Sequence, residues 1–150
     1  MSYTPHIIEP VYKSIIRSVT DVIEEINDLD LVEGDVVYHN FEERSNEDNL
    51  PPTTIIGTDG FSFDENNGLW LIRYALAVSS YKDANLLREI KVIDYLQQRF
   101  GKGKKIKLLE MDAGDQVSEL VVEEFRVPPM GQSEMRSYRT ILLELARTGK

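Results

Sequence analysis

The sequence predicts one α+β domain: a two-layer fold whose mostly antiparallel sheet carries a long N-terminal helix and a second helix packed on it. Three observations support this class. Two segments have apolar residues at helical spacing, several others are extended, and the extended segments occur in runs instead of alternating with helices. The 150 residues suit a single domain, residues 1–150. No apolar run approaches the roughly 20 residues needed to span a bilayer, so we expect no membrane partner.

The first helix is predicted from Thr4 to Asp30. Its apolar residues recur at spacings of three and four and therefore form one stripe. The stripe consists of Ile8, Val11, Ile15, Val19, Val22 and Ile26. We expect Thr4 to cap the helix and Pro5 to occupy its first turn, with Pro10 delaying or bending the start.

A short strand over residues 35–41 is followed by a long loop at about residues 42–52. The loop is rich in charge and asparagine, contains a proline pair, and has no apolar periodicity. Loops of this length inside a compact domain are usually functional or disordered. We therefore predict that it is mobile until a partner binds it. The predicted contact residues are Glu42, Glu43, Arg44, Glu47, Asp48, Leu50, Pro51 and Pro52.

A hairpin is predicted around Asn67 and Gly68, a dipeptide that favours the positive φ angles of a tight turn. Two brief extended pieces, residues 53–57 and 60–63, precede it. The strand after it, Leu69 to Val78, is apolar on both faces, with bulky residues on one and small ones on the other. That pattern predicts a central strand covered on both sides.

The second helix is predicted to follow at once, with Ser80 and Asp83 at capping-box spacing and Gly101 as its stop. Its predicted apolar stripe is Leu86, Leu87, Ile90, Ile93, Leu96 and Phe100. A basic loop then leads to three strands, over residues 105–111, 117–127 and 136–148.

Acidic residues are concentrated in the first third of the chain. Residues 1–50 hold 12 acidic and 3 basic residues, a net charge of −9, which equals the formal charge of the whole chain. One reading is a solvated face together with an acidic loop. The other is a field that repels DNA or attracts a basic partner surface.

Candidate chemical sites are few. The acidic stretch from Asp59 to Gly68 lacks the glycine that a calcium loop needs at its sixth position. His6 and His39 are too few for a zinc site in a chain without cysteine. We therefore predict no catalytic residue, no metal site and no cofactor, and expect that the protein is not an enzyme.

The lysine-bearing loop after the second helix is the remaining charged motif. Its glycines follow a helix and precede a strand, the reverse of a phosphate-binding loop. Lys102, Lys104, Lys105 and Lys107 can complement the helix C-terminus, or they can meet an acidic surface on a neighbouring copy. The predicted contact residues among them are Lys102, Lys104 and Lys105.

The order of segments resembles the tail terminator proteins of long-tailed bacteriophages, and more loosely other small neck and tail-completion proteins. The resemblance covers about Pro5 to Leu145. It runs through the N-terminal helix, "LPPTTIIG", the hairpin "FSFDENNGLWLIRYALAVSS", the helix "LLREIKVIDYLQQRF" and the closing "SYRTILLELART". The long acidic loop has no counterpart in the family's pattern, which leaves the surface facing the tube open.

The resemblance implies a structural virion subunit of the tail or neck that is assembled in the host cytoplasm. Such a subunit forms a ring with its own copies, generally a hexamer. The ring caps the tail tube protein, presents a surface to the head-tail connector protein, and lets DNA pass without specific binding. No catalytic chemistry is implied. Two other hypotheses stay open: an acidic protein-binding module or inhibitor, and a small enzyme built from scattered carboxylates.

Overall fold

The structure is a computed structural model that describes residues 3, 5–38, 53–81, 86–108, 119–127, 131–132 and 136–148. Two helices and seven strands occur within these residues, which confirms the α+β class. They are α1 (Ile8–Asp28), β1 (Asp35–Tyr38), β2 (Thr53–Asn66), β3 (Leu69–Tyr81), α2 (Leu86–Phe100), β4 (Lys105–Lys107), β5 (Glu119–Arg126), β6 (Gly131–Gln132) and β7 (Arg136–Thr148).

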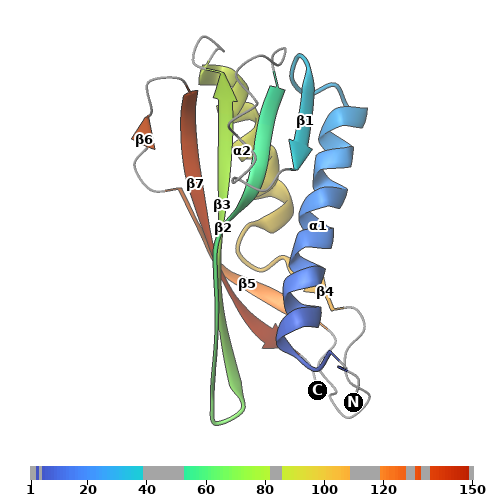
Figure 1. Cartoon of the computed structure of the whole chain (residues 1–150), viewed down its shortest axis with the longest axis vertical. Coiled ribbons are helices and arrows are strands. Elements are labelled where there is room, and N and C mark those ends of the chain that lie inside the picture. The colour runs from blue at the N-terminus through green and yellow to red at the C-terminus, as the bar shows by residue number, and fades with distance from the viewer. Residues whose placement is uncertain are drawn as a thin grey trace.

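The described strands form one sheet in the order β1-β2-β3-β7-β5-β4, with β6 beside β7. Strands β1 and β2 pair in parallel, and the other pairings are antiparallel. The turn between β2 and β3 has φ angles of 56° at Asn67 and 80° at Gly68, so the predicted tight hairpin is confirmed. Figure 1 shows this hairpin extending past the ends of the neighbouring strands.

One hydrophobic cluster joins buried residues of the sheet to buried residues of α1 and α2. Strand β3 lies between β2 and β7 in the sheet. It contributes five core residues that are each no more than 3% exposed: Trp70, Ile72, Tyr74, Leu76 and Val78. Helix α1 contributes its predicted stripe from Val11 to Ile26, whereas Ile8 is 54% exposed. Full burial of a side chain of this size contributes roughly 1.5–3 kcal/mol, so this face supplies much of the stability.

Helix α1 begins later than the sequence predicts. Its N-cap position is Ile7 and no side chain caps it, so the predicted Thr4 cap is wrong. The start at Ile8 places Pro10 within the first turn, where a backbone N–H has no partner inside the helix. A start at Pro5 would instead have needed an N–H from Pro10, which proline lacks.

Strand β3 is buried on one face only along its first half. Leu69 is 72% exposed, and Leu71 and Ala75 are half-buried, whereas Ala77 is 3% exposed. The prediction that the strand is covered on both sides is therefore wrong for the half nearest the hairpin turn.

Two of the strands contain register shifts. Strand β2 is one continuous strand, not two pieces, and its pairing with β3 shifts between Thr58 and Gly60. Strand β5 shifts against β7 between Val122 and Glu124. Each bulge adds one residue to its strand and increases the local twist.

Only the second half of the stripe predicted for helix α2 faces the core. Val92, Ile93, Leu96 and Phe100 are buried, but Leu87 and Ile90 are 54% and 43% exposed. The helix ends at Phe100 as predicted, and a Cβ at Gly101 would lie 2.6 Å from the carbonyl oxygen of Gln97. Strand β3 includes Ser80, so the predicted capping role of this serine is wrong.

Candidate interaction surface

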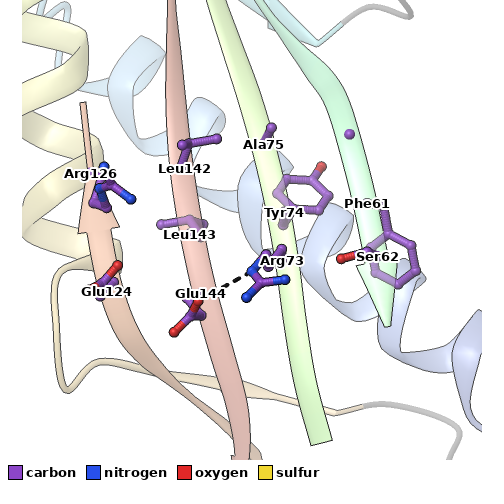
Figure 2. Close-up of a pocket in the computed structure, with 11 residues that line it drawn as sticks. Phe61, Ser62, Arg73, Tyr74, Ala75, Glu124, Arg126, Leu142, Leu143 and Glu144 are labelled. Atoms are coloured by element: carbon purple, nitrogen blue, oxygen red, sulfur yellow. Dashed lines mark hydrogen bonds and ion pairs between the residues drawn. The ribbon is translucent and has the colours of Figure 1, made fainter. Parts of the chain in front are cut away.

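A cavity of about 280 Å³ lies on the face of the sheet opposite to the core, which we call the open face. Figure 2 looks onto this cavity and shows α1 passing behind the strands. Two neighbouring rows of cross-strand partners line it. The first row is Gly60, Ala75, Leu142 and Arg126, and the second is Ser62, Arg73, Glu144 and Glu124.

The first row is hollow because its side chains in β2 and β3 are small. Gly60 pairs with Ala75, and a Cβ placed on Gly60 would lie 3.7 Å from that of Ala75. Side chains directly opposite each other in a sheet normally fill this space. The row therefore leaves an apolar floor between β2 and β7.

The second row carries the charge of the cavity. Arg73 Nε lies 3.4 Å from Glu144 Oε2, and both side chains are partly exposed. Figure 2 shows the Arg73 side chain turned toward Glu144. Glu124 is the cross-strand partner of Glu144, an arrangement of like charges that costs energy unless a cation lies nearby. Arg73 and Arg126 balance the two carboxylates, so the cavity as a whole is neutral.

The lysine-bearing loop lies at the β4 end of the strand order. Lys102, Lys104 and Lys105 are exposed, as is Lys107, and we call these four residues the lysine edge. The backbone holds the loop in place, because Gly103 N donates to Val122 O and Val122 N donates to Lys104 O, both at 2.8 Å. Lys105 Nζ also lies 3.8 Å from Oε1 of Glu119, a residue of the neighbouring strand β5. The structure thus fixes the loop backbone and leaves its lysine side chains accessible.

A different set of side chains gathers at the β1 end of the strand order. The exposed carboxylates near the end of α1 and the start of β1 form what we call the acidic end. They are Asp21, Glu24, Asp28, Asp30, Glu33 and Asp35. These residues account for half of the acidic residues in the first third of the sequence.

A buried arginine joins α2 to both β2 and the segment before β1. Arg88 is 9% exposed, its Nε donates to Thr54 Oγ1 at 2.7 Å, and its Nη1 donates to the backbone oxygen of Glu33. Burial lowers the pKa of Arg88, and Glu33 opposes that effect. This contact is structural, since it ties three segments together inside the domain.

A chain of hydroxyl groups crosses from β1 to β3. Thr58 Oγ1 lies 2.8 Å from Tyr38 Oη and 2.6 Å from Tyr74 Oη. Burial is the largest cause that raises the pKa of Tyr74, so its hydroxyl stays protonated far above neutral pH. The chain provides hydrogen-bond partners for a buried phenol and has no group that would act as a base at neutral pH.

The predicted contact residues of the loop at 42–52 lie outside the described residues. Of the predicted set, the structure therefore places only Lys102, Lys104 and Lys105, and it places them together. Sequence analysis missed the cavity on the open face. The signal was present as Gly60 and Ala75, two small residues within long strands of otherwise larger ones.

Within the described ranges, no group of three or more histidine, cysteine, aspartate or glutamate side chains is arranged to hold a metal ion. Neither described helix is long and apolar enough to cross a membrane. No protein-family model matches this chain, and no curated protein matches it with significance.

Proposed function

We propose that the protein is a structural subunit that assembles head to tail into a ring, and that this ring is the tail terminator of a long-tailed bacteriophage. The resemblance to tail terminator proteins implies that the ring is a hexamer. It would cap the tail tube and join it to the head connector in the virion. In this proposal the subunit is a two-layer domain, with α1 as its long N-terminal helix and α2 packed beside it.

The observation that carries the proposal is the separation of charge between the two ends of the strand order. The acidic end adjoins β1, and the lysine edge adjoins β4. Complementary surfaces at different places on one subunit favour heterologous contacts, and these contacts close into a ring when the rotation between copies allows it. The element order of helix, long hairpin, helix and closing strand supports the assignment to tail terminators.

The acidic composition is compatible with a DNA passage. A duplex carries one negative charge per ~1.7 Å of its axis, and proteins that hold it do so with lysine and arginine. A ring of subunits that each carry a formal charge of −9 offers few lysine or arginine contacts to the phosphates, so DNA would slide through the ring. The net charge also favours the second candidate, an acidic module that binds a basic protein as a monomer.

Native mass spectrometry of the purified protein at low salt distinguishes these candidates. A closed oligomer of defined size supports the ring, and a monomer at every concentration supports the acidic module. Electron microscopy of unfinished tail tubes mixed with the protein then tests the tail assignment. Rings seated on one end of each tube are expected, and tubes without added density would contradict the assignment while leaving ring formation intact.

A further inference from the structure

We infer that the outer edge of β2 from Asp59 to Asn66 is a docking edge for a second copy, and that the lysine edge of that copy lies against it. This inference rests on the proposed function only in requiring that copies of the chain associate. It assigns the contact to the carboxylates of residues 59–66, which lie on β2 beyond its pairing with β1, and not to the acidic end itself.

The first observation is that this part of β2 has no described strand on its outer side. Strand β1 pairs with β2 only from Thr53 to Ile56, whereas β3 pairs with its inner side as far as Asn66. Figure 1 shows the corresponding part of the hairpin projecting from the body of the domain. An edge of this kind presents backbone N–H and C=O groups that a strand of another chain can pair with.

The second observation is that the neighbouring part of the same edge is closed. Asn27 of α1 donates from Nδ2 to Val36 O at 2.8 Å and accepts from Val36 N at its Oδ1 at 2.9 Å. A side-chain amide therefore occupies the outward backbone groups of Val36, as a further strand would. This contact opposes the addition of a strand beside Val36 and leaves the hairpin part of the edge as the candidate for docking.

The third observation is charge complementarity. Residues 59–66 contain Asp59, Asp64 and Glu65 and no basic residue. All three residues are exposed, and Glu65 Oε2 also accepts a hydrogen bond from Trp70 Nε1 at 3.3 Å. Residues 102–107 contain four lysines and no acidic residue, and all four are exposed. Opposite charges on facing strands stabilise a pair, whereas like charges destabilise it. A second copy of this chain supplies the complement without any other partner.

The two edges also match in the direction of their side chains. Phe63 and Ile106 belong to the core, so their neighbours Ser62, Asp64, Lys105 and Lys107 point to the open face. If β4 of one copy continues the sheet beside β2 of the next, Asp64 and the two lysines lie on the same side of the joined sheet. The contact is heterologous, because one copy uses β2 and its neighbour uses β4.

Cross-linking between introduced cysteines tests the inference, because the chain contains no cysteine of its own. Ser62→Cys places a thiol on the docking edge, and Lys105→Cys places one on the lysine edge while keeping three lysines. With a short bismaleimide, a mixture of the two variants should give covalent dimers, and each variant alone should give none. The double variant should give a ladder that ends at the number of subunits in the ring.

Leu29→Cys is the matched control, because Leu29 is 60% exposed beside the carboxylates of the acidic end. Mixed with Lys105→Cys, it should give no dimer. Dimers from this pair instead of the Ser62 pair would overturn the inference, as would dimers from Ser62→Cys alone, which indicate a symmetric contact.

Native mass spectrometry of the parent, run beside the cross-linking, separates this inference from the proposed function. An assembled parent without a link between positions 62 and 105 would overturn the docking edge and leave the ring standing. A parent that stays monomeric at every concentration would overturn both.

Discussion

The side-chain amide of Asn27 holds both backbone hydrogen-bonding groups of Val36, with distances of 2.8 Å and 2.9 Å. Asn27 lies near the end of α1, and Val36 is a buried residue of β1. The pair therefore attaches the first strand to the helix and occupies the outward backbone groups of that strand at Val36. One side chain thus helps to position β1 and opposes the addition of another strand at this point.

Asn27→Ala should lower the free energy of unfolding by about 1–3 kcal/mol, because it leaves a buried donor and acceptor of Val36 without their partners. Urea denaturation measures the change. Asn66→Ala, at an exposed position beside the hairpin turn, is the control and should change the stability by less than about 0.5 kcal/mol. Equal losses in the two variants would show that the Asn27 contact does not stabilise the protein.

Replacing Ile72 with Asp should unfold the domain, whereas replacing Leu69 with Asp should be tolerated. Both residues belong to β3, but Ile72 is fully buried and Leu69 is 72% exposed. An unpaired buried carboxylate costs several kcal/mol, a large part of a typical stability of ~5–15 kcal/mol. Circular dichroism and thermal melting report the outcome. An Ile72→Asp protein that melts like the parent would contradict the described core.

Stability should fall as the pH rises above about 10, the ordinary pKa of tyrosine. Burial raises the pKa of Tyr74 in the folded protein, so above pH ~10 the unfolded chain loses a proton that the folded one keeps. That difference favours unfolding, and it is absent below pH ~10.

Urea denaturation of the parent and of Tyr74→Phe between pH 8 and pH 11 tests this sign. The variant should show a smaller alkaline loss of stability. The loss is not expected to vanish, since the Glu25 carboxylate, which accepts a hydrogen bond from the Tyr95 hydroxyl, raises the pKa of Tyr95. The same slope in both proteins would exclude Tyr74 as its cause.

Reversing Lys102, Lys104 and Lys105 to Glu should weaken self-association and leave the fold intact. All three side chains are exposed, and the ion pair of Lys105 with Glu119 is a surface contact of small energy. Sedimentation velocity at two salt concentrations measures the effect. In the parent, association should weaken between 0.1 M and 1 M salt, because the Debye length falls from ~10 Å to ~3 Å.

A matched comparison at equal net charge uses Lys104→Glu and Lys91→Glu. Lys91 is exposed on α2, away from the lysine edge in the sequence. Only Lys104→Glu should change the sedimentation. If both variants dissociate to the same extent, overall charge and not a specific surface controls assembly.

The sequence was most informative where one face of an element is buried along its whole length. The stripe of α1 from Val11 to Ile26 and the alternation of β3 from Trp70 to Val78 both correspond to the core. In α1 the apolar residues keep the helical spacing over several turns, and in β3 they alternate over several residues. In both elements the residues that the spacing places on one face are the buried ones.

Sequence reasoning failed where a polar side chain is buried or an apolar one is exposed. The first half of helix α2 was assigned the wrong face because Arg88 and Glu89 are buried, at 9% and 1% exposed, and Leu87 is not. Arg88 is held by Thr54, which is 34 residues away in the sequence. No periodicity in α2 records a partner at that distance. The cavity was missed for a related reason, since its rows join residues from four separate strands.

The bulges in β2 and β5 reverse which residues of a strand point inward. In β2 the core-facing residues have even numbers up to the bulge, as at Ile56, and odd numbers beyond it, as at Phe61 and Phe63. Strand β5 makes the same change between Val122 and Phe125. Each strand is thus two alternating patterns joined out of phase. Deleting the extra residue, Asp59 in β2 or Glu123 in β5, would join the two patterns in phase, so either bulge could be lost without turning any core residue of its strand toward solvent.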